Sequence, residues 1–163
     1  MAEPKSNLTR SIDDTKALME VAQGKSGADL ALVNARVLNV YTGELLDNHA
    51  VCISGKWIAY VGKNPDGAIQ DNTQVVDIKG KTLIPGLIDG HTHLAWLSTP
   101  EAFLKHAIAG GTTTIITETL EAYPVAGLDG VLDLLESFQE QPIKILSTAP
   151  YGINQQRCNG GRH

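Results

Sequence analysis

Apolar and polar residues alternate first with a helical spacing and then with the shorter spacing of strands. Ser11 with Asp14 three residues later matches a capping box, and the segment from Ser11 to Gly24 predicts a helix. Short apolar runs separated by polar turns follow it. They predict strands at residues 29–33, 36–40, 50–53, 57–61 and 74–78.

Two turns organise these predicted strands. We expect one turn at Asn34-Ala35 and a tight hairpin at Ser54-Gly55-Lys56, where glycine can adopt a positive φ. The pattern in the first half of the chain therefore predicts a leader and helix over residues 1–27, followed by a β-sandwich module over residues 28–81.

The second half changes to alternating strands and helices. A largely buried strand is predicted from the runs Thr82-Leu83-Ile84 and Leu87-Ile88, which flank Pro85. Helices and strands then alternate, with helices expected from Thr99 to about Ala109 and over residues 128–138, and strands over residues 112–117 and 143–146. This order is typical of a parallel β/α array and predicts an α/β fold.

The length of this second half limits the architecture. A complete eight-stranded TIM-like barrel takes about 250 residues, whereas residues 82–153 hold about three β/α units before a polar tail at 154–163. We expect a partial, truncated barrel. A small complete domain with an open three-stranded sheet is the alternative.

Composition narrows the possible partners. The 163 residues are 42% hydrophobic with a formal net charge of −5. The Lys and Arg residues are scattered and not clustered, which argues against nucleic-acid binding. No apolar run approaches the roughly 20 residues that span a bilayer, and the N-terminus lacks a signal-peptide pattern. The two cysteines, Cys52 and Cys158, form neither a disulfide framework nor a zinc ribbon. We expect a cytoplasmic protein with no membrane partner.

Two histidines one residue apart are the main candidates for chemistry. His91 and His93 follow the predicted strand that contains Leu87 and Ile88, and alternate side chains of a strand point to the same face. In a parallel barrel the carboxyl ends of the strands face the active site. The pattern predicts two metal ligands, although two surface histidines in a loop would have the same spacing.

Three acidic residues are candidates to assist these histidines. Asp89 lies on the same side of the strand, where it could orient a ligand or bind nearby backbone groups. Glu118 and Glu121 follow the strand at 112–117, and could hold substrate, support a metal ligand or belong to a solvated loop. Trp96 could line the mouth of a pocket or serve only in packing.

The segment from Lys79 through Pro85-Gly86-Leu87-Ile88-Asp89-Gly90 to His93, together with Gly111-Thr112-Thr113-Thr114, resembles the amidohydrolase superfamily. Within it the adenine deaminases are the most similar group, and the likeness extends back to the first helix. It implies a β/α barrel with a small β-sandwich and a divalent metal ion, Mn, Fe or Zn, bound by His91 and His93. The implied reaction is attack of a metal-activated water on adenine, giving hypoxanthine and ammonia.

The resemblance also implies what this sequence does not contain. Further metal ligands and the proton-transfer residue of the superfamily come from later strands, so no catalytic residue is assigned and the chain by itself is expected to be inactive. The implied partner is a small molecule, a purine base or a cyclic amide, and the complete enzyme is expected to be a homo-oligomer.

Two segments depart from the adenine deaminase pattern. Ala95-Trp96-Leu97-Ser98 stands where a Glu-Ser-Ser run is usual, and Glu118-Thr119-Leu120-Glu121 stands in place of Asp-Pro-His-Glu. These departures leave two alternatives open. One is another cyclic amide or amidine hydrolase, similar to dihydropyrimidinase or imidazolonepropionase, and the other is a truncated product without catalysis.

Overall fold

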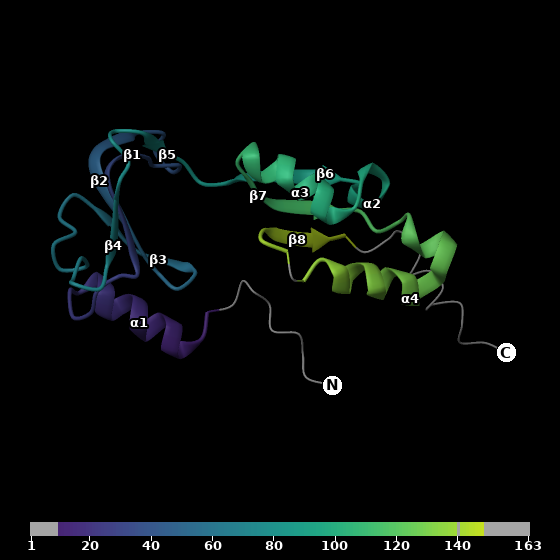
Figure 1. Ribbon diagram of the computed structural model, residues 1–163, viewed down its shortest axis with the longest axis horizontal. Helices are drawn as coiled ribbons and strands as arrows, with labels where there is room; N and C mark the ends of the chain where they lie inside the picture. The colour runs from purple at the N-terminus through teal and green to yellow at the C-terminus, as the bar shows by residue number, and fades with distance from the viewer. Residues whose placement is uncertain (1–9, 140, 149–163) are drawn as a thin grey trace. The chain divides into compact units, whose positions relative to one another are not determined.

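The computed structural model describes residues 10–139 and 141–148. Contacts divide the chain into two compact units that meet in sequence between Pro85 and Gly86, and Figure 1 shows the elements of each. Among the described residues, no helix combines the length and the apolar character needed to cross a bilayer.

The first unit is one five-stranded sheet with a helix packed against it. Its strands lie in the order β3-β2-β1-β4, and β5 also pairs with β1. The β1–β2 and β2–β3 pairs are antiparallel, whereas β4 and β5 lie parallel to β1. The elements are α1 (Ile12–Ala22), β1 (Leu30–Leu38), β2 (Leu45–Ser54), β3 (Trp57–Gly62), β4 (Gln74–Asp77) and β5 (Thr82–Leu83).

The described part of this unit contains one sheet with helix α1 packed against it, so the β-sandwich stays a prediction. Val21 of α1 packs with Ala31 of β1 and Cys52 of β2 in the buried core, together with Ala28 and Ala68. A helix can bury the apolar face of a sheet as a second sheet would.

Helix α1 begins where the capping pattern predicts. The Ser11 hydroxyl accepts a hydrogen bond from the Asp14 N–H at 3.0 Å, and the Asp14 carboxylate accepts one from the Ser11 N–H at 2.9 Å. These bonds satisfy backbone donors that the first helical turn leaves without partners. The Ser11 N–H and then its hydroxyl hold the pKa of Asp14 below its usual value, because both bonds favour the ionised carboxylate.

The predicted turn at Asn34-Ala35 is wrong, because β1 continues through these residues. Asn34 has φ of 55°, and the pairing with β2 shifts register between Leu32 and Ala35. Asparagine tolerates this left-handed conformation better than most residues, so the strand bulges instead of reversing. The hairpin at Gly55, which has φ of 57°, is confirmed and joins β2 to β3.

The second unit repeats strands and helices as the sequence predicts. Strands β6, β7 and β8 form one parallel sheet in that order. The α/β class is therefore confirmed. The elements are β6 (Leu87–Thr92), α2 (Leu94–Leu97), α3 (Pro100–Ala109), β7 (Thr112–Thr117), α4 (Ala122–Ser137) and β8 (Lys144–Ser147).

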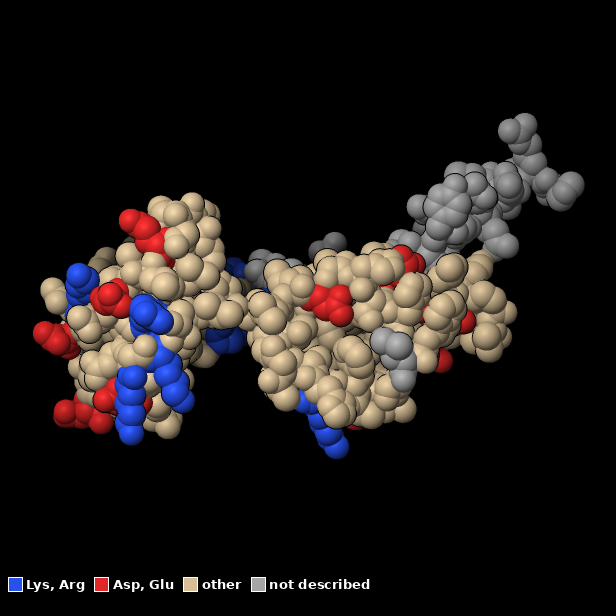
Figure 2. Space-filling model, turned by 90° about the horizontal axis from the view of Figure 1, so that it is seen from above, with Lys and Arg blue, Asp and Glu red and all other residues tan. Residues whose placement is uncertain are grey.

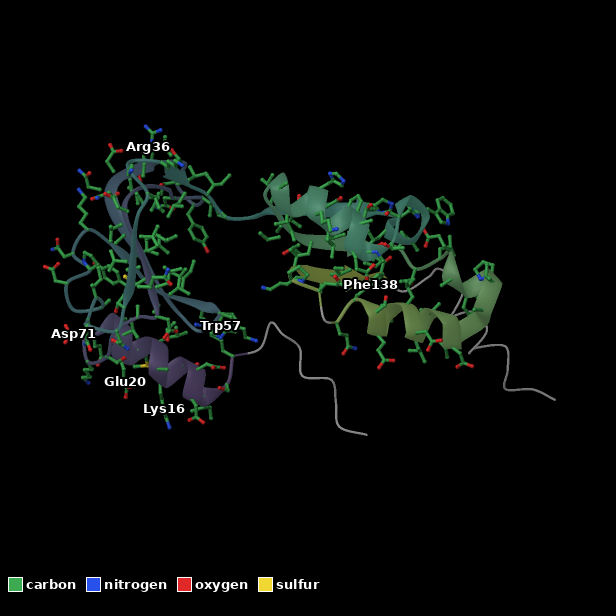
Figure 3. All side chains as sticks on the ribbon, in the orientation of Figure 1. Lys16, Glu20, Arg36, Trp57, Asp71 and Phe138 are labelled. Atoms are coloured by element: carbon green, nitrogen blue, oxygen red, sulfur yellow. The ribbon has the colours of Figure 1, made fainter. Side chains whose placement is uncertain are left out.

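Helix α4 has two parts. Gly127 has φ of 63° and ψ of −155°, a non-helical conformation that kinks the helix. The helix predicted from Leu128 corresponds to the part after this kink. Phe138, which is 5% exposed, follows α4 and lies between the helix and the sheet (Figure 3).

The single buried strand predicted around Pro85 is two strands in two units. Thr82 and Leu83 pair with β1, whereas β6 begins at Leu87 and pairs with β7. Proline has no N–H to donate to a sheet, which accounts for the break. Ile88 is also 67% exposed instead of buried, and β6 lies at the edge of the three described strands.

Charged side chains of the two units are distributed differently on the face shown in Figure 2. Lys and Arg side chains are interspersed with Asp and Glu over the first unit, and much of the second unit is uncharged. This face carries no broad basic patch.

Candidate metal centre

The end of β6 places two imidazoles together. Thr92 is 8% exposed and lies on the covered side of the strand. The side chains of His91 and His93 are 63% and 35% exposed, and their ring centroids lie 5.2 Å apart in an edge-on arrangement. The alternation of the strand therefore brings the histidine rings together, as the sequence analysis expected.

Parallel pairing brings the loop after β7 to the same edge of the sheet. Thr92 of β6 is the register partner of Thr117 of β7, so the two strands end side by side. The Glu118 N–H donates a hydrogen bond to the Thr92 carbonyl at 2.9 Å. Residues following β7 are thereby held next to the residues following β6.

The Thr117 hydroxyl connects the two strand ends from within. It accepts a hydrogen bond from the Leu94 N–H at 3.1 Å and lies 3.2 Å from the Thr92 carbonyl oxygen, to which it can donate. The side chain is fully buried. Thr117 was not among the site residues predicted from the sequence. The available signal was its position as the last residue of a threonine-rich strand.

Each histidine faces one carboxylate of this loop. Oε1 of Glu121 lies 2.6 Å from Nδ1 of His93, a short hydrogen bond. Oε1 of Glu118 lies 3.9 Å from Nδ1 of His91, within ion-pair range but too far for a hydrogen bond. The Glu121 side chain is 6% exposed and that of Glu118 is 26% exposed. The two acidic residues are therefore not equivalent.

Asp89 contacts the backbone of the strand end. Its Oδ1 accepts a hydrogen bond from the His91 N–H at 3.1 Å. This contact corresponds to the second of the two roles considered for Asp89, binding of a nearby backbone group.

Trp96 packs on one of the two histidines. Its ring stacks on His93 with centroids 4.9 Å apart and an interplanar angle of 18°, while the residue stays 71% exposed. Packing or a place at the mouth of a pocket was expected for Trp96, but its stacking on His93 was not predicted.

The donor set is compatible with a divalent metal ion. Because Nδ1 of His93 is occupied by a carboxylate, Nε2 is the ring nitrogen left to bind a metal, and such carboxylate–histidine pairs are common around metal sites. Within the described ranges, no three or more His, Cys, Asp or Glu side chains are placed to hold one ion together. A closed zinc site has four ligands. The described residues can thus provide two.

Comparison with known proteins agrees with the sequence resemblance. The profile of the Amidohydrolase family matches residues 82–159, the segment that contains the paired histidines and both carboxylates. The chain carries an amidohydrolase domain.

Sequence relatives of this amidohydrolase chain are adenine deaminases. The chain is 37% identical over 139 residues to adenine deaminase of Ruegeria sp. strain TM1040, a match that covers 85% of this chain and 23% of the relative. It is 38% identical over 138 residues to adenine deaminase of Clostridium botulinum strain ATCC 19397, with 83% and 23% covered. The chain thus spans about a quarter of the length of the curated relatives that it matches.

Solved structures of amidohydrolase-type enzymes share the fold. A putative prolidase from Bifidobacterium longum aligns with a TM-score of 0.52 at 29% identity, over 74% of this chain and 30% of that chain. Atrazine chlorohydrolase from Arthrobacter aurescens, complexed with zinc and atraton, aligns with a TM-score of 0.56 at 19% identity, over 74% and 35%. The second likeness concerns the fold alone.

Proposed function

We propose that this amidohydrolase chain contributes the first two metal ligands, His91 and His93, to a hydrolase of the adenine deaminase type. The observation that supports it best is the edge-on pair of imidazoles at the end of β6, with His93 bound to Glu121. The 37% identity to adenine deaminases favours adenine as the substrate class. The reaction consumes one water and releases hypoxanthine and ammonia.

Manganese, iron and zinc all accept imidazole nitrogen, and such an ion would supply a water that is nucleophilic near neutral pH. His91 and His93 would hold the ion, and Glu121 holds the His93 ring through Nδ1. Glu118 lies within ion-pair range of the His91 ring, and Asp89 holds the backbone N–H of His91.

The chain alone is proposed to be inactive, as a fragment of a larger protein. Two imidazoles leave a tetrahedral site half complete, so metal binding by the chain should be weak. The proton-transfer residue and the remaining ligands are proposed to come from sequence that the adenine deaminases have and this chain does not span. A small-molecule purine base as the partner, a homo-oligomeric complete enzyme and a cytoplasmic location belong to the same proposal.

A chimera tests the function directly. The chain would replace the matching N-terminal segment of the Ruegeria adenine deaminase, and ammonia release from adenine would be measured after loading with manganese, iron or zinc. We expect release that disappears when both His91 and His93 are changed to alanine. The matched control is His106→Ala, which changes an exposed histidine in the last turn of α3.

The same assay examines the alternatives. A folded, metal-loaded chimera that releases nothing from adenine but opens cyclic amides would replace the substrate proposal with the cyclic amide one. A folded chimera that binds metal and acts on neither class would favour a product without catalysis.

A further inference from the structure

The loop that contains Glu121 is held by hydrogen bonds from its first two residues, Glu118 and Thr119. The Glu118 N–H donates to the Thr92 carbonyl, and the Thr119 hydroxyl donates to the Thr148 carbonyl at 3.2 Å. Thr119 is fully buried. These bonds tie the start of the loop to the last residue of β6 and to the residue after β8, so the sheet holds the loop just before Glu121.

The Glu121 carboxylate has one strong partner. Its Oε1 is 2.6 Å from Nδ1 of His93, and its Oε2 is buried without a hydrogen-bond partner in the described part of the chain. Buried polar atoms without partners are rare in folded proteins and call for an explanation. The Glu121 side chain is 6% exposed, and its short hydrogen bond in the described part of the chain is to the His93 imidazole, which supports a role in holding this ring.

An ionised carboxylate can only accept hydrogen bonds. A neutral His93 that contacts Glu121 therefore carries its proton on Nδ1, and the lone pair available to a metal is on Nε2. Trp96 stacks on the face of the same ring, which restricts its rotation. Glu121 thus holds the edge of the His93 imidazole, and Trp96 covers its face.

His91 lacks this support. Its side chain is 63% exposed and its Nδ1 is 3.9 Å from Glu118. The two histidines of the pair therefore differ: one ring is held by a buried carboxylate and an aromatic face, and the other is comparatively exposed.

We propose that Glu121 is the positioning residue of this site, which fixes His93 as a preorganised Nε2 ligand, while His91 adjusts to the metal. The proposal rests on the proposed function in that it takes His93 to be a ligand. It adds that the two histidines differ in how firmly their rings are held, and it identifies Glu121 as the carboxylate that causes this difference.

The tautomer of His93 is a direct readout that needs no metal and no activity. The full chain labelled with ¹⁵N-histidine would be examined by long-range ¹H–¹⁵N correlation, above the ordinary histidine pKa of about 6.5. We expect His93 as the Nδ1–H tautomer in the wild type. In Glu121→Gln the amide can accept from or donate to Nδ1, so we expect a mixture of tautomers, and Glu121→Ala should behave similarly.

Glu118→Gln is the matched control, because it removes a carboxylate of the same loop that does not hydrogen-bond His93. It should leave the His93 tautomer unchanged. An Nε2–H tautomer in the wild type, or an unaltered Nδ1–H tautomer in Glu121→Gln, would overturn the proposal. Glu121→Gln keeps the side-chain volume and carries the test if Glu121→Ala does not fold.

Zinc titration by calorimetry separates this proposal from the proposed function. Loss of such a supporting carboxylate typically weakens metal binding by 10- to 100-fold, so we expect about a tenfold or greater loss in Glu121→Gln. Unchanged affinity in a variant with altered tautomer would overturn the ligand-positioning role. Absence of zinc binding through His91 and His93 in the adenine deaminase chimera, where the remaining ligands are supplied, would count against the proposed function, and the metal-free tautomer would still decide whether Glu121 orients His93.

Discussion

Trp96 stacks on the imidazole of His93, with an interplanar angle of 18° and 4.9 Å between the ring centroids. An indole in contact with a proposed metal ligand makes ion binding observable by fluorescence. The chain contains two tryptophans, and the other, Trp57, lies in the first unit (Figure 3). Arg10 and Lys56 approach the Trp57 ring.

We predict that cobalt quenches the emission of Trp96 in a Trp57→Phe variant. A paramagnetic ion on His93 would lie close to the stacked indole and shorten its excited-state lifetime. Titration of the emission with cobalt is the measurement, and zinc should compete with the effect. The quenching should be lost in Trp57→Phe with His93→Ala and kept with His106→Ala. Quenching that persists without His93 would contradict a site at this ring.

The Thr117 hydroxyl should contribute measurably to stability. In Thr117→Val the Leu94 N–H loses its acceptor while the side-chain shape is kept. Leaving a buried donor without a partner costs about 1–3 kcal/mol. The free energy of unfolding of the second unit, measured by urea titration, should therefore fall by about that amount. Thr117→Ser retains the hydroxyl and should lose less. Unchanged stability of Thr117→Val would contradict a contribution of the hydrogen bond.

Local signals predicted much of the fold, whereas contacts between strands limited what could be predicted of the site. The capping box at Ser11 and the glycine hairpin at Gly55 act within a few residues, so both were readable. The bulge at Asn34 depends on pairing with β2, which is distant in the sequence. The break at Pro85 depends on which sheet each side of the apolar run joins: the residues before it pair with β1, and those after it pair with β7.

At the site too, local patterns were predictable and contacts between strands were not. Strand alternation was enough to predict that His91 and His93 share a face. The position of Glu118 and Glu121 beyond a strand was also predicted, but their assignment to separate histidines depends on the Thr92–Thr117 register. The stacking of Trp96 depends on the short helix that begins directly after His93.

The capping carboxylate Asp14 should make α1 sensitive to acid. Hydrogen bonds from Ser11 lower the pKa of Asp14 in the folded state. Its contribution is therefore fully present above the unfolded pKa and is lost as pH falls through the folded pKa. The difference in free energy of unfolding between wild type and Asp14→Ala should be largest near neutral pH and shrink in acid.

Asp13→Ala is the control for this effect. Asp13 lies in the same helical turn and pairs with Lys16 at 3.8 Å on an exposed surface, where such pairs contribute little. Urea titrations at several pH values would compare the variants. A difference for Asp14→Ala that stays constant from neutral pH into acid would contradict the capping role of the carboxylate.

Cys52 should be protected from thiol reagents until the first unit unfolds. It is fully buried in the core that α1 shares with the sheet, and this burial raises the pKa of the Cys52 thiol. The thiolate is the reactive form, so both lower access and a smaller thiolate fraction slow the reaction. We expect slow labelling of Cys52 in a Cys158→Ser variant under native conditions. Addition of urea should raise the rate sharply at the unfolding transition of the first unit. Rapid labelling of the native variant would contradict the packing of α1 over β2, and Val21→Ala, which opens the same core, should increase the native rate.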